Sequence, residues 1–355
     1  MSQLWSQFVR ELKPYVPGAQ GGGEQVVKLN TNENPYPPSP RVTEVLRDFN
    51  AGDLRLYPQP ESDDLVKTIA RYHGLNTDQV FVGNGSDEIL AHAFNALFRR
   101  NSPLLFPDLT YSFYPVYCKL FDIAYKKVAL DASFQINVAD YAGATGGIVF
   151  ANPNAPTSLL LAQHALRDLL ASAPDSAVLV DEAYIDFSSA PESRASAIAL
   201  LNECSNLLVT RTLSKSRSLA GLRVGYALGS PELIEALRRV KNSFNSYPVD
   251  ALASALAIAS FEDEEYFQAM RQRVLAERAR LVDALRARGF EALDSAANFL
   301  MVRHSSKKAR GIYQGLHAKD VWVRYFDLPR IENYLRISVG SAEQNDALLD
   351  ALDTL

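Results

Sequence analysis

The sequence is poor in the residues that hold together small secreted domains or structural metal sites. It contains only two cysteines, Cys118 and Cys204, in 355 residues, which excludes a disulfide framework and a thiolate metal site. Its five histidines show no spacing typical of metal ligands. The most apolar stretch, residues 251–261, is too short to span a bilayer, and the N-terminus lacks a signal-peptide core. We therefore expect a cytoplasmic protein with no membrane partner and no metal.

The sequence also lacks a strong excess of either positive or negative charge. The 36 basic and 41 acidic residues are mixed along the chain and give a net charge of -5. This balance argues against a nucleic-acid surface, although a local basic pocket remains compatible with it. A chain of 355 residues is also too long for one comfortable core, so we expect a large domain and a smaller one.

The middle of the chain alternates short β-rich runs with longer helical patterns. Strand candidates lie at residues 81–82, 104–106, 147–150, 177–180, 207–210 and 224–228. Helical patterns lie between them, at 88–99, 162–172 and 195–203. Buried apolar strands that alternate with helices predict an α/β fold, in which a mostly parallel central sheet is flanked by helices.

The pattern changes after about residue 262. A charged amphipathic helix is predicted over 264–288 and ends at Gly289. Strand candidates at 299–303, 321–324 and 334–338 and helices near 307–318 and 342–353 follow it. We predict an N-terminal arm over 1–40 that reads as loop and packs with the small domain, a large domain over 41–262, and a small α+β domain over 263–355.

Polar residues follow several predicted strands, where ligands bind in open α/β sheets. Gly83-Asn84-Gly85-Ser86-Asp87-Glu88 combines glycine turns with a helix start, whose free N–H groups suit an anion such as phosphate. Taken alone, the segment is more often an ordinary helix cap with glycine turns than a phosphate-binding turn. Asp181 follows another apolar strand and would need a cationic partner in that setting, for which a protonated pyridine nitrogen is suitable.

A lysine follows the next predicted strand. Lys215 lies between Ser214 and Ser216, in the setting of a Schiff-base nucleophile, and Arg223 follows shortly after it. Considered singly, a lysine is more often a solvated surface charge. An anion-binding turn, an acid, a lysine and an arginine at successive strand ends together indicate one site.

These segments resemble the motifs of the fold-type I aminotransferases, which depend on pyridoxal phosphate. The resemblance rests on residues 152–157, 181–184, 214–215 and 220–225 and extends over nearly the whole chain. Within this family, residues 28–35, 56–58, 83–88, 323–326 and 334–340 are most similar to the histidinol-phosphate aminotransferases. That resemblance implies transfer of an amino group from histidinol phosphate to 2-oxoglutarate in histidine biosynthesis. The products would be imidazole acetol phosphate and glutamate.

The resemblance also implies a role for each matching residue. Lys215 would bind pyridoxal phosphate as a Schiff base and move the proton, Asp181 would pair with the pyridine nitrogen, and Tyr184 would bind the ring hydroxyl. The remaining cofactor contacts would come from Ser86, Asp87, Tyr111, Asn154, Ser214 and Arg223, with Tyr57 reaching the cofactor phosphate of the other subunit of a homodimer. The substrate would be bound by Asn34, Arg324 and Arg336. Tyr111 could instead be ordinary packing, and the arginines could be surface ion pairs.

The sequence departs from the family pattern in the loop over residues 152–158. Ala155 stands where an asparagine is usual, and Ser158 stands where a glycine is usual. The hydrogen bond to the ring hydroxyl would then come from Asn154 or Asn152, or be absent.

Other functions remain compatible with parts of the pattern. A threonine-phosphate decarboxylase or an aromatic amino-acid aminotransferase would use the same cofactor frame. A non-catalytic regulator would be expected to carry a DNA-binding segment or to have lost Lys215. A nucleotide-binding protein would need a Walker or dinucleotide motif, and the glycine turn at 83–85 matches neither.

Overall fold

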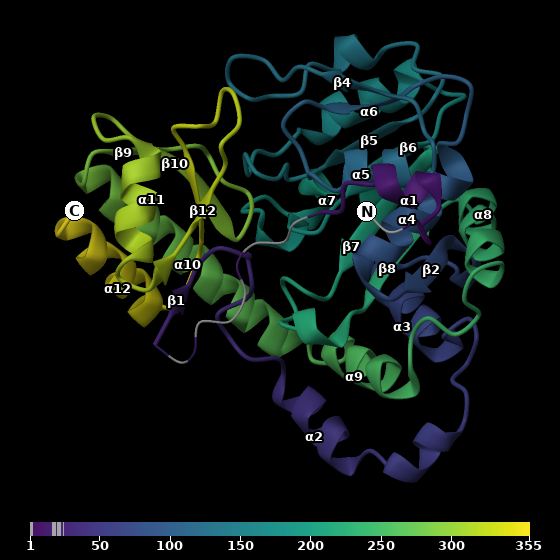
Figure 1. The fold of residues 1–355 in the computed structure, drawn as a ribbon. Coiled ribbons are helices and arrows are strands. Elements are labelled where there is room, and N and C mark those ends of the chain that lie inside the picture. The colour runs from purple at the N-terminus through teal and green to yellow at the C-terminus, as the bar shows by residue number, and fades with distance from the viewer. Residues whose placement is uncertain (1–2, 16–18, 20–22, 24) are drawn as a thin grey trace.

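The computed structural model describes residues 3–15, 19, 23 and 25–355. These residues form a seven-stranded sheet in the order β2-β8-β7-β6-β5-β3-β4 (Figure 1). Its strands, in that order, are Val80–Gly83, Gly225–Gly229, Leu207–Thr212, Val178–Asp181, Ile148–Ala151, Leu104–Pro107 and Tyr125–Val128. β8 is antiparallel to both of its neighbours, whereas the other pairs are parallel. The predicted α/β class with a mostly parallel sheet is confirmed.

Most residues of the central strands are apolar because helices cover both faces of the sheet, whereas β6 and β7 end in polar residues. Along β6, Val178 and Val180 belong to one buried cluster and Leu179 belongs to the cluster on the other face. Alternate residues of a strand point to opposite faces, so a strand buried on both sides reads as a continuous apolar run. The covering helices are α3 (Asp63–His73), α4 (Gly85–Leu97), α5 (Tyr114–Leu120), α6 (Gln163–Ser172), α7 (Glu192–Ala195), α8 (Pro231–Asn242) and α9 (Ala251–Phe261).

A second, antiparallel sheet lies beside the first and has its own core. Its order is β12-β13-β10-β9, formed by Arg324–Tyr325, Leu335–Ser338, Phe299–His304 and Phe290–Ala292. Leu281, Leu300, Ile337 and Leu348 are fully buried in this second core. Three helices accompany it: α10 (Glu264–Ala287), α11 (Ala309–His317) and α12 (Ala342–Asp353). Figure 1 shows the long α10 leading from α9 to this part of the molecule.

The N-terminal segment contains more regular structure than the loop that the sequence predicts. It includes α1 (Gln7–Glu11) and β1 (Val27–Lys28), and α2 (Pro40–Asp48) follows it. β1 pairs in parallel with β11 (Val321–Trp322). The single strand predicted over 321–324 is therefore wrong: β11 and β12 belong to different sheets. None of the helices in the described ranges is long and apolar enough to cross a membrane.

Candidate active site

A cavity of about 310 Å³ opens between the ends of the large sheet and the smaller sheet. Asp181 ends β6, Lys215 follows β7, and Ser86 lies in the first turn of α4. From the smaller sheet, Arg324 of β12 and Arg336 of β13 reach the same cavity. Most of the residues predicted for the site line it: Ser86, Asp87, Tyr111, Asp181, Tyr184, Ser214, Lys215, Arg223, Arg324 and Arg336.

Asp181 is an acid in an environment that disfavours its charge. The side chain is 5% exposed and accepts weak hydrogen bonds from Thr210 Oγ1 at 3.3 Å and Tyr114 OH at 3.4 Å. Burial raises the pKa of Asp181 to about 7, against 3.8 for an ordinary aspartate. A cation facing this carboxylate would stabilise its ionised form, so Asp181 is suited to bind a positively charged group.

An anion-binding turn lies at the start of α4. Gly85 begins the helix with φ +78°, and a Cβ at this position would lie 2.5 Å from Arg223 Nη2. A Cβ at Gly225 would lie 2.6 Å from the backbone nitrogen of Ser86. Gly85 therefore lets the guanidinium of Arg223 approach the helix N-terminus closely, and Gly225 lets β8 pack against the same turn. Arg223 Nη1 also lies 3.4 Å from Ser214 Oγ, so helix N–H groups, hydroxyls and a guanidinium converge on one place suited to a phosphate.

Lys215 is held by the N-terminal segment. Its Nζ donates a hydrogen bond to the Thr31 carbonyl at 3.1 Å and lies 5.8 Å from the centroid of the Tyr184 ring. The Tyr184 hydroxyl accepts a hydrogen bond from Asn32 Nδ2 at 3.1 Å. Asn34 Nδ2 donates to the carbonyls of Lys215 and Ser216, both at 3.1 Å. The amine thus points into the cavity beside a phenol, while its backbone is fixed from behind.

Arg336 presents a buried guanidinium to the cavity. Its Nη2 donates to the Asn30 carbonyl at 2.9 Å, whereas its buried Nε has no hydrogen-bond partner among the described residues. Burial lowers the pKa of Arg336, and Arg324 adds a second positive charge nearby. An anion would satisfy the free donor and reduce the repulsion between the two arginines.

Three residues predicted for the site are not among the described residues that line the cavity: Asn34, Asn154 and Tyr57. Asn34 instead binds the backbone of the lysine loop. Asn154 is buried and directs its amide to the Leu109 carbonyl and to Thr157 Oγ1, at 2.9 and 3.0 Å. Its own oxygen accepts from Thr110 Oγ1 at 3.1 Å, so Asn154 holds the segment with Leu109 and Thr110, which lines the cavity.

Tyr57 lies on the surface of this chain. Its side chain is 84% exposed and stacks on Tyr247, with the ring centroids 4.7 Å apart. Within one copy of the chain it makes no part of the cavity wall that the described residues form.

Sequence reasoning missed several residues of the cavity wall, including Tyr15, Thr31 and Asn32. Asn32 has φ +55°, a left-handed conformation that asparagine tolerates better than most residues. Asn32 and Asn34 consequently point to different places: Asn32 to the Tyr184 hydroxyl, and Asn34 to the backbone of Lys215 and Ser216. An Asn-rich stretch flanked by loop residues was the available signal, but it does not reveal which asparagine faces the site.

We compared the sequence and the fold of this chain with those of known proteins. The family model for class I and II aminotransferases matches residues 24–352. Histidinol-phosphate aminotransferase 1 of Pseudomonas fluorescens is 56% identical over 355 residues, covering 100% of both chains. The solved structure of histidinol-phosphate aminotransferase from Sinorhizobium meliloti, in complex with pyridoxal-5'-phosphate, superposes with a TM-score of 0.88 at 22% identity and covers 100% of this chain and 98% of its own. L-threonine-O-3-phosphate decarboxylase from Porphyromonas gingivalis has a similar fold, with a TM-score of 0.78 at 20% identity, covering 92% of this chain and 98% of its own.

Proposed function

Because this chain belongs to the family of class I and II aminotransferases, we propose that it transfers an amino group between histidinol phosphate and 2-oxoglutarate. The products would be imidazole acetol phosphate and glutamate, formed in two half-reactions that share one cofactor, as a step of histidine biosynthesis. The observation that carries the proposal is the convergence of Lys215, Asp181, the anion-binding turn and Arg336 in one cavity. The full-length relative at 56% identity supports the choice of substrate.

Pyridoxal phosphate fits the cavity because each of its charged or polar groups has a complementary residue. The turn formed by Ser86, Ser214 and Arg223 suits its phosphate, and the buried carboxylate of Asp181 suits its protonated ring nitrogen. When bound, the cofactor supplies a ring that accepts the electron pair left on the substrate carbon after a proton departs. Tyr111 would lie against the ring face, and Tyr184, with Asn32 beside it, would donate to the ring hydroxyl.

Lys215 would have two tasks in this site. Its amine would hold the cofactor covalently, and once freed by the substrate amine it would act as the base. Nζ would take the proton from the substrate carbon that bears the amino group and deliver it to the cofactor carbon bonded to the same nitrogen. The ring of Tyr184 lies beside this amine, with its centroid 5.8 Å from Nζ.

The two arginines of the smaller sheet would bind the anionic end of each substrate. A guanidinium matches either a carboxylate or a phosphate with two parallel hydrogen bonds. Arg336 has a free buried Nε for this purpose, and Arg324 lines the same wall. One pair of arginines could therefore serve both the phosphate of histidinol phosphate and a carboxylate of glutamate.

The first test is a half-reaction. Protein loaded with pyridoxal phosphate and given histidinol phosphate without any keto acid is expected to lose the visible absorption of the lysine-bound cofactor and gain that of the aminated cofactor. An unchanged spectrum would overturn the proposal that histidinol phosphate is the substrate. Phosphothreonine and aromatic amino acids are the next substrates to try, because the decarboxylase fold is so similar.

We propose that the active form is a cytoplasmic homodimer in which Tyr57 completes the partner's cofactor site. Exposed apolar side chains support this, since Leu54, Leu56, Tyr57 and Phe244 are 57%, 56%, 84% and 81% exposed. Such a concentration of exposed apolar surface marks a protein contact. The partner would cover it and bring Tyr57 to a second cavity.

Subunit mixing tests this arrangement. If Tyr57 acts across the interface, a dimer of one inactive K215A subunit and one weakened Y57A subunit has one intact site. That site combines Lys215 of the Y57A subunit with Tyr57 of the K215A subunit. Equal mixing should then restore about a quarter of wild-type activity, because random pairing makes half of the dimers hybrid. No gain after confirmed subunit exchange, or an active species of 39.2 kDa, would contradict the shared site.

We further propose that residues 41–262 and 263–355 form two domains, with residues 1–40 as an arm attached to the second. Support comes from the separate buried cores of the two sheets and from the pairing of β1 with β11. The cavity lies between the two proposed domains, so their relative movement would open or close it.

A further inference from the structure

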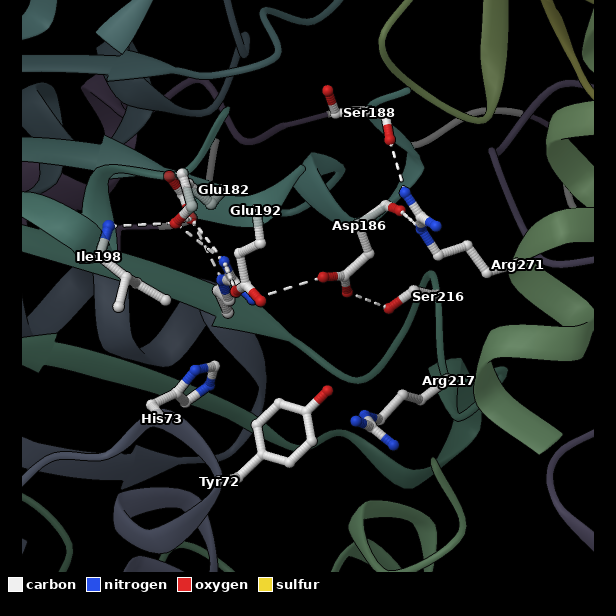
Figure 2. Close-up of polar contacts among 12 residues, drawn as sticks. Tyr72, His73, Glu182, Asp186, Ser188, Glu192, Ile198, Ser216, Arg217 and Arg271 are labelled. Carbon is white, nitrogen blue, oxygen red and sulfur yellow. Dashed lines mark hydrogen bonds and ion pairs between the residues drawn. The ribbon is translucent and has the colours of Figure 1, made fainter. Parts of the chain in front are cut away.

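A cluster of charges around the buried Arg211 lies behind the cavity, on the opposite side of the strand ends. We call it the rear cluster, and it consists of Glu182, Asp186, Glu192, Ser196 and Arg211. Figure 2 labels its three carboxylates, Glu182, Asp186 and Glu192. Arg211 is 4% exposed and donates from Nε and Nη2 to Glu182 at 3.1 and 3.0 Å. It also reaches Asp186 at 3.3 Å and Glu192 at 2.8 Å, so one guanidinium links three carboxylates.

The register of two strands places this cluster directly behind the reacting groups. Asp181 of β6 is opposite Thr210 of β7, and the next residues along the chain are Glu182 and Arg211. Successive residues of a strand point to opposite faces. Thr210 therefore contacts Asp181 on the cavity side, while Arg211 contacts Glu182 on the other side.

The rear cluster is joined to the lysine loop by one hydrogen bond. Ser216, the residue after Lys215, is 5% exposed and donates from Oγ to Asp186 Oδ2 at 2.5 Å. Figure 2 shows the Asp186 carboxylate directed toward Ser216. The other oxygen of Asp186 is 3.3 Å from Arg211 Nη1. A continuous path of contacts thus runs from Arg211 through Asp186 to the residue next to Lys215.

The lysine loop is anchored a second time by Arg217. Its guanidinium is buried over the rings of Phe261 and Phe267, at 4.3 and 4.2 Å, and donates to the Ser260 carbonyl. Arg217 attaches the loop to α9 and α10, whereas Ser216 attaches it to the large sheet. The Ser216 contact therefore links the lysine loop to the turn Ile185–Phe187, which closely follows Asp181 at the end of β6.

We propose that Arg211 is a positioning residue for Lys215 and acts through Asp186 and Ser216. The inference rests on the proposed function, in which Lys215 is the reacting amine. Asp186 lies in a short 3-10 turn, Ile185–Phe187, and its side chain is 27% exposed, so burial alone does not fix it. Arg211 orients this carboxylate, the carboxylate orients Ser216, and the backbone of Lys215 is thereby held in place. Misplacement of a reacting group by about 1 Å can lower a rate by roughly 100-fold.

The test compares two buried serines. S216A removes the hydrogen bond to Asp186. The control, S176A, removes the hydrogen bond from Ser176 Oγ to the Ala144 carbonyl, which is 2.6 Å long. Ser176 precedes the start of β6, at the end of this strand that is distant from Asp181. Ser176 is 0% exposed, so both changes remove one hydrogen bond from a buried serine. We expect similar losses of thermal stability from both. S216A alone should slow the attachment of added pyridoxal phosphate to Lys215, and the half-reaction, by roughly 10- to 100-fold.

A double variant tests the path itself. R211K keeps the charge but cannot bind its three carboxylates in the same geometry. If Arg211 acts through Ser216, R211K together with S216A should be little slower than the slower single variant. Rates in S216A equal to those in S176A, or fully additive effects in the double variant, would overturn the proposal. Wild-type protein that fails to attach the cofactor would instead overturn the proposed function on which it rests.

Discussion

Replacing Lys215 by alanine is expected to lower the rate of amino transfer by roughly 10⁴-fold or more, since both covalent attachment and the base are lost together. The amine points into the cavity, where it donates one hydrogen bond to the Thr31 carbonyl. Losing this single contact should change the stability of the fold little. The measurement is the rate of the half-reaction with histidinol phosphate, together with the visible absorption of the lysine-bound cofactor, which should be absent.

The matched control is K215R, which keeps a positive charge at the same position. A guanidinium stays protonated and can neither form the covalent link nor act as the base. If Lys215 contributed only its charge, K215R would recover most of the activity. We expect K215R to be as slow as K215A. A K215A protein that keeps more than about a hundredth of the wild-type rate would contradict the assigned role.

Much of the large sheet could be predicted because its strands are buried on both faces. β5 and β6 each carry four buried residues between turns, which is the pattern that the sequence shows at 147–150 and 177–180. β4 was missed for the opposite physical reason. It is an edge strand with the sequence Tyr-Lys-Lys-Val and three exposed residues, so neither alternation nor an apolar run marks it.

Structure that depends on distant partners could not be predicted. β1 has two residues, and its partner β11 begins at Val321. Nothing local distinguishes Val27 and Lys28 from loop residues. The helix predicted over 195–203 is wrong. α7 ends at Ala195, and a 3-10 turn, Ala197–Leu200, follows, which Ser196 caps by accepting from the Ile198 nitrogen.

The site residues at strand ends could likewise be predicted from the sequence, whereas those that depend on loop conformation or distant partners could not. The ends of neighbouring strands meet at one edge of the sheet, so the sequence could bring Asp181 and Lys215 to one cavity. The direction of a side chain in an irregular loop follows from backbone angles, and the φ of +55° at Asn32 had no sequence signature. The rear cluster was missed because Arg211 continues an apparently apolar strand, and its carboxylate partners come from other loops.

Replacing Asp181 by asparagine is expected to slow the half-reaction by roughly 10²- to 10³-fold. An amide has nearly the shape of the carboxylate but cannot keep a pyridine nitrogen protonated, so the ring accepts electrons less readily. D181E, which retains the acid on a longer side chain, should recover part of this loss. A D181N rate within about threefold of wild type would exclude the proposed pairing with the ring nitrogen.

The same carboxylate predicts a pH dependence of stability in the cofactor-free protein. Burial raises the pKa of Asp181 to about 7, from 3.8 for an ordinary aspartate. The folded protein therefore binds more protons than the unfolded chain between these two values. The stability that the protonated side chain contributes is complete below about pH 4 and is lost as the pH rises through 7. D181N, which does not titrate, should lose less stability than wild type between pH 5 and pH 8.

Bound cofactor should reverse this behaviour, because its ring nitrogen supplies the cation that the ionised Asp181 lacks. We expect pyridoxal phosphate to stabilise wild type more at pH 8 than at pH 5, relative to cofactor-free protein, and to stabilise D181N similarly at both. Urea unfolding of both proteins with and without cofactor measures this. Other buried acids, including Glu182, whose pKa is also raised by burial, are common to both proteins and cancel in the comparison. If the cofactor stabilised wild type and D181N with the same pH dependence, Asp181 would not face the ring nitrogen.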